Sequence, residues 1–307
     1  MISLGIDTSN YTTSAAVYDT SSGTLVQSRR LLKVKPGELG LRQADAVFQH
    51  TLALPEIIKE VSENAAAKPD VIGVSVSPSE EEDSYMPCFM TGKSAADCMG
   101  SVFGVPVKYF SHQAGHIAAA VYSAGRLDLL KTEFIAFHVS GGTTQGLFVR
   151  PDEKKIITVE KVVESLDLKA GQAIDRVGVM LGLQFPAGQK LDELSRSSSR
   201  KYKVRPFMRD GSCSLSGVQN QCEAMLKNGE ASADIANYCI TYICEALSLM
   251  TDELLKKNPG VPVVYSGGVM SNSMIRECFS RRFGAVFAAP GYSSDNACGT
   301  AVLAALK

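Results

Sequence analysis

The sequence is poor in the features that would assign it to a specialised class of protein. It has only four histidines in 307 residues, and its formal net charge of -1 gives no overall sign of nucleic-acid or membrane binding. No window reaches the roughly 18 apolar residues of a membrane helix, and the start MISLGIDTS lacks the basic and apolar run of a secretion signal. We therefore expect a cytoplasmic protein with no membrane contact, in which any nucleic-acid contact uses a local basic patch.

The eight cysteines are scattered along the chain and include no C-x-x-C pair. Metal or disulfide chemistry is one interpretation, but small buried side chains in a reducing cell are the simpler one. A hydrophobic content of 45% and a charged content of 21% indicate a globular protein. A chain of 307 residues is long enough for two domains with a substantial core.

The apolar pattern predicts alternating strands and helices in two similar halves. An apolar strand, a turn of small polar residues and a second apolar strand occur at 3–19 and again at 134–149. Residues 155–165 are expected to add a pair of strands to the second sheet, and the polar, basic segment 195–211 is expected to be an exposed loop. Helices are expected near 47–61, 94–103 and the histidine pair, and at 170–182, 216–227, 232–256, 271–281 and 295–306.

Two of the histidines lie four residues apart in the stretch FSHQAGHIAAA. On a helix, His112 and His116 would point to the same face, where two imidazoles can bind one metal ion. A carboxylate from elsewhere would complete a two-histidine, one-carboxylate site with open positions for a substrate. The alternative is a pair of surface histidines or hydrogen-bonded core histidines, because such spacing is common on helices.

Three turns of small polar residues follow apolar strands. The first contains Thr8 and Ser9, and the second, SGGTTQ at 140–145, combines glycines with hydroxyl groups that can cradle phosphate oxygens. The third, Gly267 and Gly268, opens a helix at a position where a nucleotide often rests in α/β folds. The first turn alone could be a simple hairpin.

Taken together, the repeated turns resemble the duplicated actin-like ATPase fold, an α/β architecture in which two related lobes clasp ATP. The resemblance implies that residues 1–132 and 295–307 form the lobe that carries the metal histidines. It also implies that residues 133–294 form the lobe that carries the nucleotide-binding motifs.

Further motifs, taken in chain order, resemble the tRNA threonylcarbamoyladenosine transferase family, whose members were once called glycoproteases. The matches are His112 and His116 for H-x-x-x-H, 140–145 for S-G-G-H-T-Q, 175–188 for D-x-x-x-x-L-G-L-x-x-P-G-G, 216–218 for S-G-[LV], Gly267, Gly268, Val269 and Asn272 for G-G-V-x-x-N, and 294–296 for S/T-D-N. They span nearly the whole chain, which makes the set far more specific than any single motif.

The resemblance implies a site for a divalent metal and a site for ATP, AMP or a carbamoyl-adenylate. His112, His116 and Asp295 would hold the metal, with Fe²⁺ expected and Zn²⁺ or Mg²⁺ as alternatives. The nucleotide would be bound by Thr8, Ser9, His138, Val139, Ser140, Gly141, Gly142, Asp175, Gly188, Asp192, Gly267, Gly268 and Asn272. Within this set, Asp175 would accept hydrogen bonds from the ribose. In simpler interpretations Asp295 caps the last helix and Asp175 forms a surface ion pair.

The departures from the family pattern lie around the expected acceptor side. Tyr11 and Thr12 replace an acidic pair, Thr143 replaces the histidine of S-G-G-H-T-Q, and Gln219 replaces a lysine. The segment 77–92, with its acidic run EEED, replaces a glycine-rich stretch, and it is either a solvated loop or a reshaped entry to the site. These changes indicate a divergent paralogue.

The implied activity is metal-dependent transfer of a carbamoyl group from an adenylate, in the family from threonylcarbamoyl-AMP to an anticodon-loop adenosine of tRNA. The basic stretch 196–209 either follows tRNA phosphates or is a solvated loop. The alternatives are a small-molecule carbamoyltransferase of the same fold and a non-catalytic nucleotide-binding subunit. The chain could pair with a paralogous actin-like subunit or with itself. A zinc peptidase is disfavoured because residues 113–115 contain no glutamate to act as general base.

Overall fold

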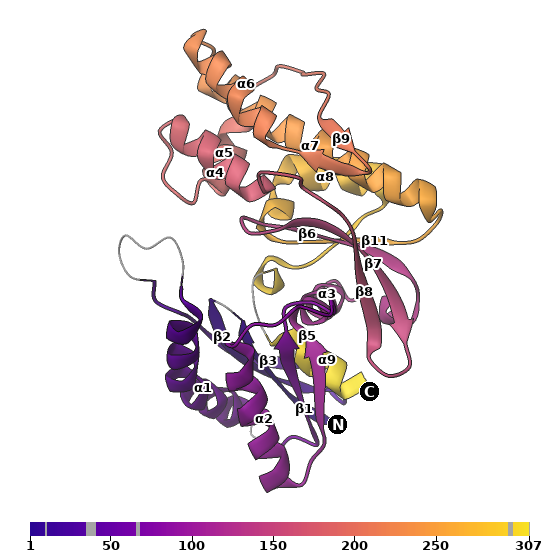
Figure 1. Cartoon of the computed structure of the whole chain (residues 1–307). Coiled ribbons are helices and arrows are strands. Elements are labelled where there is room, and N and C mark those ends of the chain that lie inside the picture. Colours follow the sequence, from indigo (N-terminus) through magenta and orange to yellow (C-terminus); the bar gives the residue numbers. More distant parts are fainter. Residues whose placement is uncertain (10, 35–40, 66–67, 294–296, 307) are drawn as a thin grey trace. The chain divides into compact units, whose positions relative to one another are not determined.

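The computed structural model describes residues 1–9, 11–34, 41–65, 68–293 and 297–306. The chain divides into two compact units. The first contains Met1–Thr132, Arg150–Val159 and Gly291–Lys307, and the second contains Glu133–Val149 and Glu160–Pro290. Each unit is built on a five-stranded mixed sheet with helices packed against it (Figure 1).

The sheet of the first unit has the strand order β3-β2-β1-β4-β5. Its strands are β1 (Ile2–Ser9), β2 (Thr12–Asp19), β3 (Leu25–Leu31), β4 (Val71–Ser77) and β5 (Val107–Ser111). The first three form an antiparallel meander, whereas β4 pairs parallel to β1 and β5 pairs parallel to β4.

The sheet of the second unit repeats this arrangement. Its order, β12-β11-β6-β7-β8, places three strands that are consecutive in the chain beside two parallel strands, as in the first unit. Its strands are β6 (Phe134–Val139), β7 (Thr144–Asp152), β8 (Ile156–Glu164), β11 (Val263–Ser266) and β12 (Val286–Phe287). The end of β7 and the start of β8, within Arg150–Val159, are grouped with the first unit. The predicted internal duplication is confirmed. The pair of strands expected at 155–165 is wrong: this run has no glycine, proline or asparagine to turn the chain, and it forms the single strand β8.

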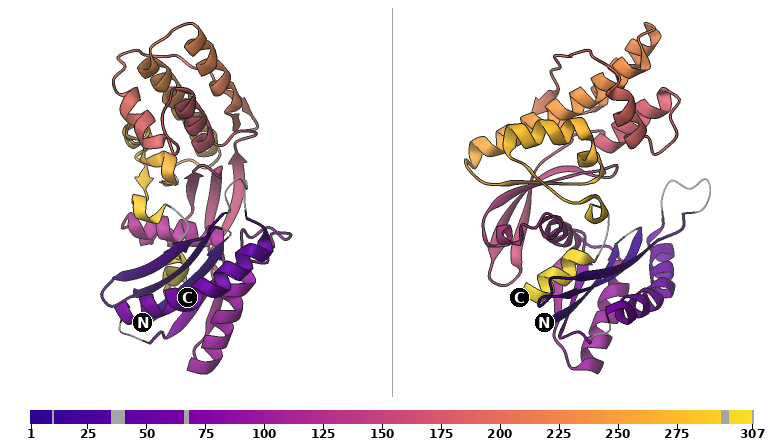
Figure 2. Two further views of the ribbon diagram at one scale, coloured as in Figure 1. Left: turned by 90° about the vertical axis from the view of Figure 1, so that its left-hand side faces the viewer. Right: turned by 180° about the vertical axis from the view of Figure 1, so that it is seen from behind.

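Helices cover both faces of the first sheet (Figure 1, Figure 2). Helices α1 (Gln43–Ala65) and α2 (Phe89–Phe103) pack against one face, and α3 (His112–Ser123) and α9 (Cys298–Leu306) against the other. The short helix η1 (Leu127–Lys131) also belongs to the first unit, and η3 (Pro290–Tyr292) lies where the chain passes from the second unit back to the first. Within the described ranges, no helix combines the length and the apolar character that crossing a membrane requires.

The alternation of side chains along β1 explains this layering. Leu4 and Ile6 point to one face and share a core with Ile57 of α1. Gly5 points to the other face, where a Cβ atom would lie 2.5 Å from the carbonyl oxygen of Ala297. A glycine is therefore needed for the start of α9 to approach the sheet this closely.

In the second unit the helices form one large core with the sheet. They are α4 (Ala170–Met180), α5 (Gly188–Ser195), α6 (Ser216–Lys227), α7 (Ser232–Lys257), α8 (Ser273–Phe283) and the short η2 (Gly268–Ser271). Ile135, Phe137 and Val139 of β6 are buried in this core together with residues of α4, α6 and α7. Helix α5 was not predicted, because its eight residues give too short an apolar pattern.

The segment 195–211 was expected to be a loop throughout, and this is wrong at its end. Strand β9 (Phe207–Arg209) pairs antiparallel with β10 (Ser212–Ser214) around the turn at Asp210 and Gly211, both with positive φ. The basic side chains of the segment are exposed, as expected for a polar stretch.

Candidate functional site

The two motif histidines lie at the start of α3, where strand β5 leads directly into the helix. Ser111 caps this helix, because its Oγ accepts a hydrogen bond from the backbone N–H of Ala114 at 3.1 Å. The cap fixes the first turn, and His112 and His116 share one helix face. Their Nε2 atoms are 2.8 Å apart, so the structure brings these two predicted metal ligands together.

A carboxylate that the sequence analysis did not select lies behind the first histidine. Asp7, near the end of β1, is only 1% exposed, and its Oδ2 lies 2.7 Å from the Nδ1 atom of His112. The available signal was an acidic residue at the end of an apolar strand, directly before a polar turn. Sequence spacing could not pair it with a histidine 105 positions away.

The third predicted metal ligand, Asp295, lies outside the described residues. Among the described residues, no three His, Cys, Asp or Glu side chains are grouped so that they could hold a metal ion. The described start of α9 nevertheless packs tightly on α3, since a Cβ atom on Gly299 would lie 1.8 Å from the carbonyl oxygen of Gly115. Gly115 is the residue directly before His116.

Two buried side chains of the same unit, His50 and Cys88, favour their neutral forms. Burial is the main cause that lowers the pKa of His50, whose Nδ1 lies 2.7 Å from the hydroxyl of Thr13. Burial, helped by the charge of Asp7, raises the pKa of Cys88 to about 11. Cys88 is therefore a thiol at neutral pH and a poor nucleophile.

The hydroxyl groups predicted for the first phosphate turn serve the local fold. Thr8 is fully buried, and its Oγ1 donates to the carbonyl of Cys88 at 3.0 Å and accepts from the N–H of Gly92 at 3.2 Å. The hydroxyl of Ser9 donates to the carbonyl of Thr12 at 3.5 Å. Thr8 thus ties the start of α2 to β1.

Most of the residues predicted to bind a nucleotide line one cavity in the second unit, with a volume of about 450 Å³. Its walls come from the turn after β6, from α4, from the start of α5 and from the segment between β11 and α8. The lining residues are Ser140, Gly141, Gly171, Ile174, Asp175, Pro186, Gly188, Gln189, Asp192, Gly268, Val269, Ser271 and Asn272. Gly171, Ile174, Pro186, Gln189, Val269 and Ser271 were not predicted as ligand-binding residues.

Close backbone contacts join the segments that line this cavity. A Cβ atom on Gly171 would lie 2.6 Å from the backbone nitrogen of Gly141. Gly267 has a φ of +96°, and a Cβ atom there would lie 2.2 Å from the carbonyl oxygen of Val139. Glycine is required at both positions, and these contacts set the separation of the two turns.

The polar side chains of the cavity differ in how much of their hydrogen-bonding capacity is used. Asp192 is 8% exposed, and it accepts from the N–H of Ser273 at 3.1 Å and from the hydroxyl of Ser273 at 2.9 Å. Asp175 accepts from the N–H of Ala187 through Oδ1 only, at 2.8 Å. Asn272 caps α8 through Oδ1, whereas its buried Nδ2 has no hydrogen-bond partner among the described residues.

The remaining predicted nucleotide residues do not line the cavity. His138 lies with its Nδ1 atom 3.1 Å from the hydroxyl of Ser266, and Val139 is fully buried in the core. Gly142 and Gly267 adjoin the lining residues Gly141 and Gly268.

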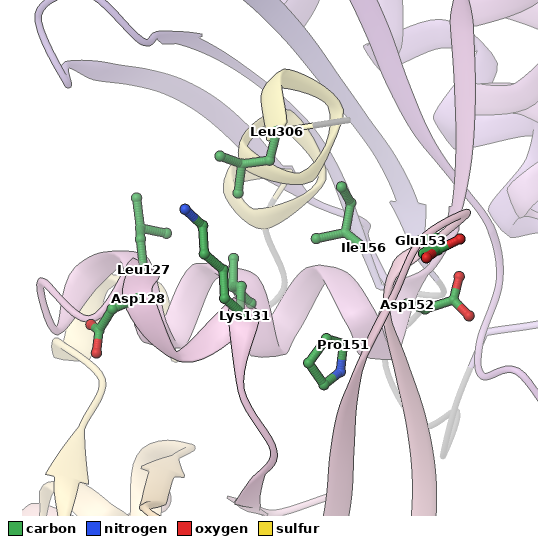
Figure 3. A pocket seen from close by; sticks show the side chains of 9 residues that line it. Leu127, Asp128, Lys131, Pro151, Asp152, Glu153, Ile156 and Leu306 are labelled. Atoms are coloured by element: carbon green, nitrogen blue, oxygen red, sulfur yellow. The ribbon is translucent and has the colours of Figure 1, made fainter.

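A second hollow, of about 530 Å³, lies in the first unit and contains none of the predicted site residues. Figure 3 shows Leu127, Ile156 and Leu306 around it, with the charged Lys131 and Asp152 among its labelled residues. Its lining side chains are apolar or charged, so among them none offers the hydroxyl or side-chain amide groups found in the cavity of the second unit.

The fold places the chain among proteins with the actin-like ATPase fold. It is similar to full-length HypF in a phosphate- and nucleotide-bound form (TM-score 0.63, 14% identity, 99% of this chain and 55% of HypF). It is also similar to component A of the Acidaminococcus fermentans (R)-2-hydroxyglutaryl-CoA dehydratase (TM-score 0.54, 17% identity, 99% of this chain and 97% of the other). A third similar structure is the ROK hexokinase of Thermus thermophilus (TM-score 0.53, 15% identity, 100% of this chain and 98% of the other).

Within this fold the sequence defines the family more narrowly. The family model for TsaD, the tRNA N6-adenosine threonylcarbamoyltransferase, matches residues 35–302, and the chain belongs to this family. It is 28% identical to the tRNA N6-adenosine threonylcarbamoyltransferase of Aromatoleum aromaticum (strain DSM 19018 / LMG 30748 / EbN1), over 99% of this chain and 90% of that protein. It is also 28% identical to the protein of that name from Buchnera aphidicola subsp. Schizaphis graminum (strain Sg), over 89% and 81%. It is a divergent member.

Proposed function

We propose that this chain is a metal-dependent transferase that moves a carbamoyl group from an adenylate to an amine. The observation that carries the proposal is the cavity of the second unit, in which residues from four separated segments of the chain, including Ser140, Asp175 and Asn272, come together. Family membership supplies the reaction class, and the nucleotide-bound HypF structure supports a nucleotide ligand for this fold.

The proposed roles follow from the atoms that each side chain leaves available. Backbone N–H groups at Gly141 and Gly142 would hold the phosphate, because glycines permit its close approach. Asp175 would use Oδ2 to accept a hydrogen bond from the ribose, since only its Oδ1 is used by Ala187. The unpartnered Nδ2 of Asn272 would donate to the nucleotide.

The two histidines fit a divalent metal, because both present Nε2 to a common point. We propose His112, His116 and Asp295 as its ligands, a donor set that suits Fe²⁺ and also accepts Zn²⁺. Such an ion, when bound, supplies Lewis-acid stabilisation of negative charge on a carbonyl or phosphate oxygen.

In the proposed reaction the amine nitrogen forms a bond to the carbamoyl carbon and the carbon–oxygen bond to AMP breaks. The amine loses a proton, and AMP leaves with the bonding electron pair. The chain's contribution is to hold donor and acceptor in line, since a weakly nucleophilic amine gains most from positioning.

We propose tRNA as the acceptor, with a basic surface formed by Lys201, Lys203, Arg205 and Arg209 as its contact. Arg196 and Arg200 of the same segment form ion pairs with Asp192, Glu230 and Asp234. The other four are exposed and have no ion pair among the described residues, so their charges are available to phosphates.

The alternative is a carbamoyltransferase that acts on a small molecule. It is favoured by Gln219, which stands where the family has a lysine. The Oε1 atom of Gln219 accepts from Arg176 at 3.2 Å and its Nε2 donates to Glu223 at 3.0 Å. The side-chain amide of Gln219 is thus hydrogen-bonded to its neighbours. Unlike a lysine, it has no positive charge that could attract an RNA phosphate.

The test combines binding with turnover. Calorimetry with AMP on the wild type and on Asp175→Asn should show roughly tenfold weaker binding for the variant, as expected when a hydrogen bond to a carboxylate is lost. Purified protein should then convert threonylcarbamoyl-AMP and unmodified tRNA to modified tRNA and AMP. AMP release with small amines but not with tRNA would support the alternative, and no AMP binding would exclude both.

A further inference from the structure

Both ring nitrogens of His112 face partners. Its Nδ1 lies 2.7 Å from Oδ2 of Asp7, and its Nε2 lies 2.8 Å from Nε2 of His116. The two nitrogens point away from each other across the imidazole ring. Asp7 therefore contacts the ring on the side opposite to the other histidine.

The burial of Asp7 sets it apart from a surface ion-pair partner. The side chain is 1% exposed, and its Oδ1 has no hydrogen-bond partner among the described residues. Burying a carboxylate with one oxygen unsatisfied is costly, so stability alone gives little reason for an acid here. Its position on β1, directly opposite Ser14 of β2, places it on the face of the sheet that α3 and α9 cover.

We propose that Asp7 is a positioning residue that fixes the Nδ1–H tautomer of His112, so that the Nε2 lone pair is presented to the metal. This inference rests on the metal site of the proposed function. An ionised carboxylate can only accept a hydrogen bond, so it requires a proton on Nδ1. A neutral imidazole that carries its proton on Nδ1 has its lone pair on Nε2, the atom that faces His116.

The surroundings support this role. Phe89 is buried, and its ring packs on the imidazole of His112 with centroids 6.0 Å apart, which limits rotation of the ring. Within the described part of the chain, the side-chain hydrogen bond of Asp7 goes to the His112 nitrogen that points away from His116, so Asp7 acts through His112. Carboxylates placed in this way behind metal-bound histidines orient the ring and raise its basicity.

The experiment compares Asp7→Asn and Asp7→Glu with the matched control Ser14→Ala. Ser14 lies directly opposite Asp7 on β2 and is equally buried, and its hydroxyl donates to the backbone carbonyl of Asp7. The first readout is the ¹⁵N spectrum of the histidines in chelator-treated protein, with His112→Gln used for assignment. The second readout is titration with Zn²⁺ and with Fe²⁺.

We expect wild type and Ser14→Ala to hold His112 as the single Nδ1–H tautomer. In Asp7→Asn the amide can donate to Nδ1, so the Nε2–H tautomer should appear and metal affinity should fall roughly 10- to 100-fold. Asp7→Glu keeps the acceptor and should recover part of both properties.

An unchanged tautomer and unchanged metal affinity in Asp7→Asn would overturn the inference. If that variant does not fold, a wild-type spectrum with the proton of His112 on Nε2 would overturn it equally. A wild type that binds neither metal defeats the metal part of the proposed function, whereas the tautomer readout still decides whether Asp7 fixes the ring.

Discussion

The two carboxylates of the nucleotide cavity show that residues with the same expected role can have different local bonding. Asp192 accepts two hydrogen bonds from Ser273 and one from Arg196, and so holds the start of α8. Asp175 accepts from the backbone N–H of Ala187 through one oxygen, and its other oxygen has no hydrogen-bond partner in the described ranges. The ligand role that we propose therefore falls more naturally on Asp175.

The positive φ of Gly267 leads to a prediction about stability. Gly267→Ala should destabilise the protein by at least about 1–3 kcal/mol, because alanine disfavours positive φ and its Cβ would lie 2.2 Å from the carbonyl oxygen of Val139. The free energy of unfolding in urea measures the effect. Gly268→Ala is the control, since a Cβ there meets nothing within 4 Å. Equal stabilities of the two variants would contradict the prediction.

The lowered pKa of Asp167 leads us to expect that the stability of the protein depends on pH. Burial is the largest single influence and raises its pKa, but hydrogen bonds from Ser214, Ser216 and two backbone N–H groups outweigh it and lower the pKa to about 2 from 3.8. A carboxyl whose pKa is lowered by folding stabilises the fold above its unfolded pKa, and this contribution is lost as the pH falls through the folded pKa.

We therefore expect Asp167→Asn to be less stable than wild type by roughly 1 kcal/mol at pH 7, a modest figure because the side chain is largely exposed. The difference should shrink as the pH falls from about 4 to 2. Urea unfolding at several pH values measures it. A difference that does not change between pH 7 and pH 2.5 would show that the carboxylate's charge is not the cause.

At the scale of elements, the packing of α9 on α3 depends on two glycines. Gly299→Ala should destabilise the first unit by about 1–3 kcal/mol or more, as overpacking does, because its Cβ would lie 1.8 Å from the carbonyl oxygen of Gly115. Thermal unfolding measures the change. Gly291→Ala, whose Cβ would meet nothing within 4 Å, should unfold at the wild-type temperature. A matching loss in both variants would rule out close packing as the cause.

The glycine contact also links this packing to the proposed metal site. Gly115 lies between His112 and His116 on α3, so a shift of α9 that moves this turn would move the histidines. A lower metal affinity in Gly299→Ala that is absent from Gly291→Ala would support the link.

At the scale of the whole molecule, the two units carry separate groups of candidate ligands. The histidine pair belongs to the first unit and the nucleotide cavity to the second. In chelator-treated protein, His112→Ala should therefore bind AMP within about threefold of wild type, a difference of less than 1 kcal/mol. Calorimetry measures this binding.

The same variant should lose the bound metal, which elemental analysis of protein purified without chelator measures. Asp175→Asn should keep its metal and lose AMP affinity. Metal content that does not differ between His112→Ala and wild type would remove the histidine pair as a site.

Sequence patterns alone predicted the duplicated α/β fold, because strand and helix periodicities depend on neighbouring residues. They also placed the histidine pair on a single helix face, since positions i and i+4 share a face in any helix. The sequence analysis missed short elements such as α5 and β9, because a segment of so few residues shows no clear hydrophobic periodicity. The family resemblance selected most of the cavity residues.

Only the tertiary structure paired Asp7 with His112 and showed that Thr8 and Asp192 serve the local fold. These facts depend on which segments, far apart in the chain, come within hydrogen-bond distance of each other. Local sequence carries the spacing along a strand or a helix, whereas the distance between two elements is decided by how their side chains pack. For that reason the sequence determined the family, the fold and the candidate residues, and packing decided which of their atoms remain available for a ligand.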